Sequence, residues 1–125
     1  MKYVILIYGN PRSRAAWAGF TDEQKAAGLG IYAQLNHDLD TSGERIVSAR
    51  LTDPALTTRV TVRGGRPFTT DGPFAEVKEQ LAGFYLVECD SPERAIEIAA
   101  RIPEANFSEV EVRPVMGLAD DLAGA

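Results

Sequence analysis

Four ionisable side chains lie close together in one short segment of the chain, and their types suit proton transfer. Asp71 begins an Asp-Gly-Pro turn, and Glu76, Lys78 and Glu79 follow it, directly before an apolar strand expected over residues 81–89. A tight turn that leads into a buried strand holds side chains rigidly. A carboxylate there could move a proton if its pKa were raised towards neutrality, and the lysine could hold an anion. We therefore take Asp71, Lys78 and Glu79 as the candidate catalytic groups.

Aromatic residues beside these groups could form the rest of a ligand site. Phe74 and Tyr85, together with Glu76, are the predicted binding residues of this segment, because aromatic rings would lower the polarity around a carboxylate. The alternative is structural: Asp71 accepts backbone N–H groups within an Asx turn, and the charges stay solvated. Turn residues of this kind are more often structural, so both interpretations remain open.

Two further candidates lie outside this segment. Tyr8 ends the first expected strand and Arg113 belongs to the last one. The expected strand register turns both side chains to the face of the sheet that no predicted helix covers. There, Tyr8 could contact a ligand and Arg113 could bind a carboxylate or phosphate. An ion pair of Arg113 with Glu111, or with a partner subunit, is the alternative.

Composition excludes several classes of protein. The chain has 125 residues, 45% of them hydrophobic and 25% charged, which is typical of a single globular domain. A formal net charge of -5 argues against a nucleic-acid partner. Cys89 is the only cysteine, so no intramolecular disulfide can form, and no His/Cys cluster suggests a metal or other cofactor. The apolar run at residues 3–8 is too short to cross a bilayer, so we expect a cytoplasmic protein without membrane contact.

Periodicity and turn residues predict the elements. Thr21 and Gln24 form a capping box that predicts a helix to about residue 42, and Ser91-Pro92 predicts a second helix to residue 101. Residues 59–63 alternate in polarity and Gly64-Gly65 turns the chain back, which predicts a hairpin. Strands are expected over residues 2–8, 45–51, 81–89 and 109–113. The domain would span residues 1–116, with a flexible tail over residues 117–125.

Apart from the hairpin, the order is strand-helix-strand-strand-helix-strand, which is the ferredoxin-like pattern with the first and third strands central. We therefore predict an α+β fold, a ferredoxin-like sandwich with an inserted β-hairpin. Two helices cover only one face of such a sheet, and each central apolar side chain left in water forgoes roughly 1.5–3 kcal/mol of burial free energy. We therefore expect a homodimer in which a second copy packs sheet to sheet.

The segment around the Asp-Gly-Pro turn resembles the YCII-related family, specifically its DGPF subgroup. The matching positions are Asp71, Gly72, Pro73, Phe74, Glu76, Lys78, Glu79 and Tyr85. Residues 2–8, the helix end at residues 100–103 and residues 110–115 agree with it, so the resemblance covers about residues 1–116. It implies a dimeric α+β barrel. We refer to residues 71–79 as the DGPF loop.

The resemblance leaves the function open. Most members have no assigned activity, and relatives include a dehydrochlorinase-like lyase and proteins proposed to act through a His–Asp pair. Here His37 and Asp38 lie on a predicted helix, with His37 about 160° around the axis from Leu35, so that mechanism is not expected to transfer. We expect a small-molecule-binding protein or a cofactor-independent lyase or isomerase with its cleft at the DGPF loop. The alternative is an interaction module for an extracytoplasmic-function sigma factor, a partner implied by gene neighbourhood, which could contact Asp38, Asp40 and Glu44.

Overall fold

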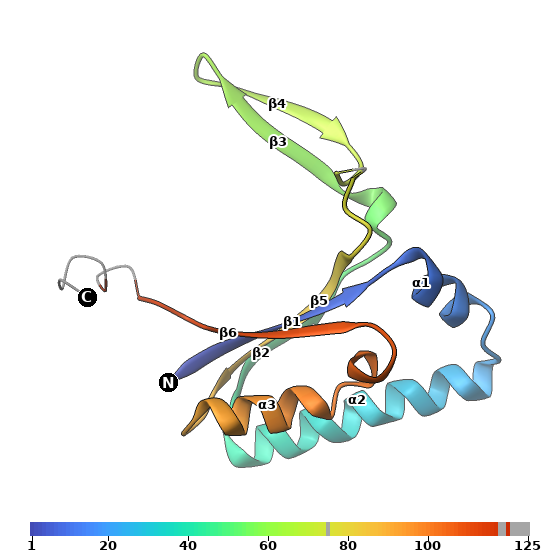
Figure 1. The fold of residues 1–125 in the computed structure, drawn as a ribbon, viewed down its shortest axis with the longest axis vertical. Helices are drawn as coiled ribbons and strands as arrows, with labels where there is room; N and C mark the ends of the chain where they lie inside the picture. The colour runs from blue at the N-terminus through green and yellow to red at the C-terminus, as the bar shows by residue number, and fades with distance from the viewer. Residues whose placement is uncertain (75, 118–119, 121–125) are drawn as a thin grey trace.

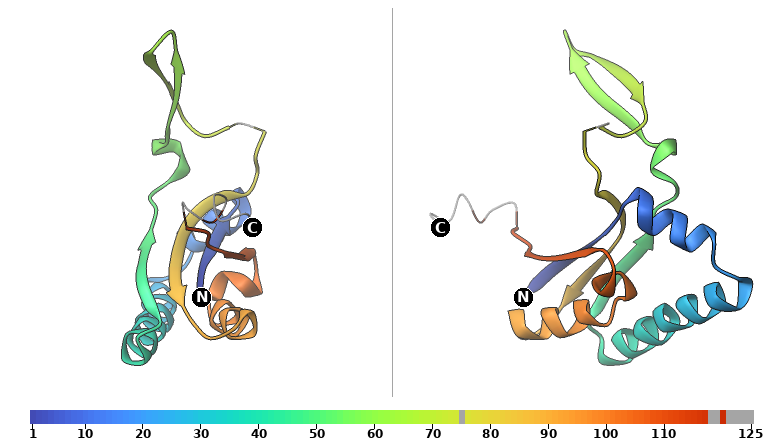
Figure 2. Two further views of the ribbon diagram at one scale, coloured as in Figure 1. Left: turned by 90° about the vertical axis from the view of Figure 1, so that its left-hand side faces the viewer. Right: turned by 45° about the vertical axis from the view of Figure 1, so that its right-hand side comes forward.

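The computed structural model describes residues 1–74, 76–117 and 120, and its centre is an antiparallel sheet in the order β2-β5-β1-β6 (Figure 1). The strands are β1 (Lys2–Gly9), β2 (Arg45–Arg50), β5 (Gln80–Glu88) and β6 (Glu109–Pro114). Helices α2 (Asp22–Ser42) and α3 (Pro92–Ala100) lie on the same side of this sheet (Figure 2). This arrangement confirms the predicted ferredoxin-like α+β fold.

The core lies between the central strands and the two covering helices. Tyr3, Ile5 and Ile7 of β1 are buried on the helix face, where Ile5 lies opposite Tyr85 of β5. The helices add the buried side chains of Leu35, Leu39, Ala95, Ile98 and Ala99. Full burial of a large apolar side chain contributes about 1.5–3 kcal/mol to the stability of the fold. Burial of these side chains therefore favours the central positions of β1 and β5 in the sheet.

The opposite face of the sheet, which we call the open face, has no covering helix in the described part of the chain. Val4 lies opposite Leu86 and Leu6 lies opposite Phe84, and all four side chains are half-buried. This is the face that the expected homodimer would cover. The dimer itself remains a prediction.

Both covering helices begin where the sequence predicts. Thr21 accepts from the backbone N–H of Gln24 at 3.1 Å, and the Gln24 side chain accepts from the Thr21 N–H at 2.9 Å, which completes the capping box. Gly43 ends α2 with a φ of 77°, a conformation that glycine adopts without steric cost. Ser91 caps α3 by accepting from the Arg94 N–H at 3.1 Å.

A short helix, α1 (Pro11–Ala18), was not predicted from the sequence. Asn10 accepts from the Ser13 N–H at 2.8 Å, and the Ser13 hydroxyl accepts from the Asn10 N–H at 2.9 Å. Pro11 has the fixed φ that suits a first helical position. The helix has no fully buried residue, so it lacks the apolar periodicity from which a helix is usually predicted.

The predicted hairpin forms a separate two-stranded sheet of β3 (Thr58–Arg63) and β4 (Arg66–Asp71), and it projects away from the main sheet (Figure 1). Gly64 and Gly65 turn it with φ values of 57° and 76°. We call it the hairpin arm. Its strand register places Val60, Val62, Pro67 and Thr69 on one face, and Arg59, Arg63, Arg66 and Phe68 on the other.

Two short 3-10 helices complete the described chain: η1 (Pro54–Leu56) at the base of the hairpin arm, and η2 (Pro103–Asn106) before β6. Of the tail predicted over residues 117–125, all but Gly117 and Asp120 lie outside the described residues. None of the described helices combines the length and hydropathy that crossing a bilayer requires.

Candidate functional site

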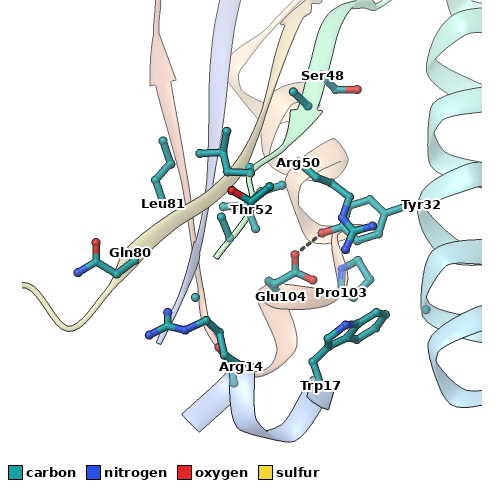
Figure 3. A pocket seen from close by; sticks show the side chains of 18 of the residues that line it. Arg14, Trp17, Tyr32, Ser48, Arg50, Thr52, Gln80, Leu81, Pro103 and Glu104 are labelled. Carbon is teal, nitrogen blue, oxygen red and sulfur yellow. Dashed lines mark hydrogen bonds between the residues drawn. The ribbon is translucent and has the colours of Figure 1, made fainter. Parts of the chain in front are cut away.

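A cavity of about 570 Å³ lies between the helices and the sheet, within the size range of small-molecule sites. Its walls come from α1, α2, β2, β5 and η2 (Figure 3). Trp17, Phe20 and Leu29 give it an apolar side, and Gly28 lets α2 approach Trp17, since a Cβ there would lie 3.3 Å from the Trp17 ring. The cavity can hold a ligand with an apolar body.

One hydrogen bond inside this cavity joins two groups that can move a proton. The Tyr32 hydroxyl, on the inner side of α2, donates to a carboxylate oxygen of Glu104 in η2 (Figure 3). Burial of the ring raises the pKa of Tyr32 well above its usual value, and the hydrogen bond and the charge of Glu104 raise it further. The positive charge of Arg50 opposes this effect. Tyr32 therefore stays protonated at neutral pH and acts as a hydrogen-bond donor.

A second tyrosine in the cavity wall belongs to a more extended network. Arg45 donates to the Ser48 hydroxyl at 2.9 Å, Ser48 lies opposite Tyr85 in the pairing of β2 with β5, and the Tyr85 hydroxyl donates to the Asn36 side-chain oxygen. Arg45 is itself held by Asp40, at N···O distances of 2.7 and 2.6 Å. Burial raises the pKa of Tyr85. These contacts hold β2 against α2 and leave Tyr32 and Glu104 as the compact acid–base pair.

The pair can support chemistry at a carbon next to a carbonyl group. A tyrosine has a single hydroxyl proton, so a ligand oxygen that accepts it would release Glu104 from its hydrogen bond. The arrangement is therefore suited to proton abstraction by Glu104 with the developing charge stabilised by Tyr32.

The described part of the DGPF loop lies outside this cavity. Asp71 ends β4 opposite Thr58, and Asp71, Glu76 and Lys78 are all exposed. The Gly72 N–H donates to the Thr57 carbonyl at 2.6 Å, and its φ of 82° favours glycine. The structure thus gives the Asp-Gly-Pro turn a backbone role, while the catalytic roles predicted for Asp71 and Lys78 remain untested.

A smaller cavity of about 460 Å³ adjoins the first one at the base of the hairpin arm. Phe74 and Pro73 line it, and the Arg59 guanidinium lies 4.7 Å from the centre of the Phe74 ring. Both cavities share the wall residues Leu51, Thr52, Asp53, Pro54, Gln80 and Leu81. The DGPF loop therefore borders the approach to the larger cavity.

Glu79 is the one described carboxylate of the loop that contacts the domain. The Asn10 side chain donates to one of its oxygens at 3.3 Å, and the other oxygen is buried with no hydrogen-bond partner among the described residues. Because Asn10 also caps α1, this contact ties the loop to the helix that borders the cavity.

The remaining predicted site residues are divided between the two faces of the sheet. Tyr85 lines the larger cavity, whereas Tyr8 and Arg113 lie on the open face, where Arg113 is opposite Val4. A hydrogen bond with Glu111 and partial burial raise the pKa of Tyr8, and the charge of Arg113 opposes this. The structure thus separates Tyr85 from Tyr8 and Arg113. His37, predicted to be a surface residue, is exposed.

Sequence reasoning missed Tyr32 as a polar residue and missed Glu104 entirely. Helical spacing in the sequence puts Tyr32 on the same apolar face as Leu35 and Leu39, and its ring packs against the core there. A buried tyrosine hydroxyl usually has a hydrogen-bond partner, and that rule was the available signal. The partner is 72 residues away in the chain, so the pair could not be deduced from spacing.

The fold and cavity define a ferredoxin-like α+β protein with a small-molecule-sized site between its helices and sheet. The family model for the YCII-related domain matches residues 1–119, and the chain belongs to this family. It is 33% identical over 117 residues to an uncharacterised protein of Rhizobium meliloti (strain 1021), and the match covers 92% of each chain.

Proposed function

We propose that this protein binds a small organic molecule in the helix–sheet cavity and acts on it as a cofactor-independent isomerase or lyase. The observation that carries the proposal is the Tyr32–Glu104 hydrogen bond inside a cavity with a largely apolar side. A half-buried proton donor and acceptor next to space for a ligand mark a candidate acid–base site.

The proposed reaction uses only these two side chains. Glu104 takes a proton from a carbon next to a ligand carbonyl, the electron pair of the broken C–H bond forms a C=C bond, and the π pair of the C=O bond moves onto the carbonyl oxygen. The Tyr32 hydroxyl donates to that oxygen. Return of the proton to another carbon completes an isomerisation, and departure of a neighbouring group with its electron pair completes an elimination. Neither outcome requires an oxidant or a reductant.

The test is exchange of carbon-bound protons for deuterium, followed by proton NMR over a panel of small ketones and keto acids. We expect the Glu104→Gln variant to lose about 10²–10⁴-fold in exchange rate, the usual contribution of a general base. Tyr32→Phe should also slow the exchange. Asp71→Ala is the control for the DGPF loop and should exchange at the wild-type rate.

Two results would contradict this proposal. If Asp71→Ala lost exchange while Glu104→Gln kept it, the DGPF loop would be the site. If the wild type exchanged no member of the panel, proton transfer at a carbonyl-activated carbon would be excluded as the function.

An interaction module is the second candidate function, and one observation bears on where a partner would bind. Asp38, Asp40 and Glu44 are each paired with an arginine of the same chain, at N···O distances of 2.6, 2.6 and 2.8 Å. Their charges are therefore largely neutralised. The hairpin arm, whose Val60 and Val62 side chains are 61% and 67% exposed, offers a better surface for a protein partner.

We also propose that the protein works as a homodimer through its open face. The half-buried apolar side chains of β1 and β5 on that face support this, because a second copy would remove them from water.

A further inference from the structure

The wall of the helix–sheet cavity has more positive than negative side chains, although the chain as a whole is negatively charged. Three arginines and two carboxylates line the cavity, in a protein whose net charge is -5. Both carboxylates are engaged within the chain: Glu104 accepts from Tyr32, and Asp53 accepts from the Ala55 N–H at 2.9 Å. Of the arginines, Arg45 is neutralised by Asp40. Two positive charges, on Arg14 and Arg50, have no ion pair with any described residue.

Arg50 is the unpaired cation beside the acid–base pair. It is on β2, on the helix face of the sheet, since it lies opposite the buried Gly83. Its side chain extends from the strand towards Tyr32 (Figure 3), and its charge acts on the Tyr32 hydroxyl. A guanidinium presents a planar fork of N–H donors that fits a carboxylate. In this position it would bind an anionic group of a ligand whose neighbouring atoms reach Tyr32 and Glu104.

Arg14 has a different position in the same wall. Its guanidinium is directed towards Gln80, away from Tyr32 and Glu104 (Figure 3), and one of its terminal nitrogens is buried without a hydrogen-bond partner among the described residues. It therefore contributes the same charge to the cavity without facing the acid–base pair. This makes Arg14 a charge-matched control for Arg50.

We propose that the ligand of this cavity is an organic acid whose carboxylate binds Arg50 and whose apolar body packs against Trp17 and Phe20. The inference rests on the proposed ligand site but does not depend on proton transfer by Tyr32 and Glu104. It also gives Arg50 a positioning role, because a carboxylate held there places the adjacent carbons beside the acid–base pair.

The test uses matched pairs of probes with the same apolar body, one an anionic carboxylate and the other its neutral amide: cyclohexanecarboxylate with cyclohexanecarboxamide, and octanoate with octanamide. Trp17 is the only tryptophan and lies in the cavity wall, so its fluorescence reports binding directly. We expect each acid to bind the wild type at least about tenfold more tightly than its amide, as a charge-assisted hydrogen bond predicts. Arg50→Gln should remove this preference by weakening acid binding alone, and Arg14→Gln should retain it.

Each other outcome has a defined meaning. Equal binding of acid and amide would overturn the organic-acid inference but leave the cavity as a ligand site. No binding of any probe would overturn both the organic-acid inference and the ligand site. A preference that survives in Arg50→Gln, or is lost in Arg14→Gln instead, would overturn the assignment to Arg50. Cyclohexyl phosphate is the last probe. If it bound more tightly than cyclohexanecarboxylate, the carboxylate assignment would be overturned and the anionic group of the ligand would be a phosphate.

Discussion

At the scale of single residues, the ionisation of Tyr32 should make the free energy of unfolding depend on pH. Burial and Glu104 favour the protonated phenol in the folded protein, whereas in the unfolded chain this group titrates near its usual pKa of 10.0. At a pH above 10 but below the raised pKa of the folded protein, the unfolded chain has lost the Tyr32 proton that the folded protein keeps. The free energy of unfolding should therefore be unaffected by this group below about pH 10 and should fall as the pH rises above it.

We predict that Tyr32→Phe reduces this alkaline loss of stability. Urea unfolding measured at several pH values from about 8 to about 11 should show a steeper decline for the wild type than for the variant. Tyr85→Phe is a useful comparison, because burial raises the pKa of Tyr85 as well. Identical slopes in wild type and Tyr32→Phe would mean that the Tyr32 hydroxyl is not held protonated by the fold.

At the scale of elements, Asn10 connects α1 with the DGPF loop. It caps the helix through the Ser13 N–H and donates to Glu79, whereas Thr21 caps α2 with the same kind of capping box and is exposed. Loss of an N-cap costs about 1 kcal/mol. Asn10→Ala should therefore destabilise the protein by more than Thr21→Ala, because it also removes the contact with Glu79.

Thermal unfolding of the two variants measures this difference, and hydrogen exchange locates it. Backbone amides of α1 and the DGPF loop should exchange faster in Asn10→Ala than in Thr21→Ala. Equal melting temperatures, with no change in the loop, would show that the Asn10–Glu79 contact does not hold the loop.

The elements were more predictable from sequence than the site was. Runs of apolar residues identified β1 and β5, and the capping box of Thr21 and Gln24 marked the start of α2, because these signals act within a few residues. Helix α1 was missed because it has no fully buried residue. The cavity was missed because helix, strand and 3-10 helix contribute to it from distant parts of the chain, and only the tertiary fold brings Tyr32 to Glu104.

At the scale of the whole molecule, the open face determines the expected oligomeric state. We predict a particle of twice the 13.6 kDa chain mass by light scattering at micromolar concentration. Phe84→Asp places a charge on the open face and should give a monomer, because a charge buried in an apolar interface is costly. Ile96→Asp is the control, since Ile96 is exposed on α3. A wild type of monomeric mass would contradict the dimer.

The position of the hairpin arm in the chain has a consequence for how such proteins can diverge. The arm and the DGPF loop form one excursion between β2 and β5, and its two ends are joined by the bond from the Leu51 N–H to the Ala82 carbonyl at 2.8 Å. The entropic cost of closing a loop grows slowly with its length. Insertions, deletions and exchanges can therefore accumulate there while the four-stranded sheet is conserved. Each such change would also remodel the wall shared by the two cavities, so new ligand preferences can evolve without a new fold.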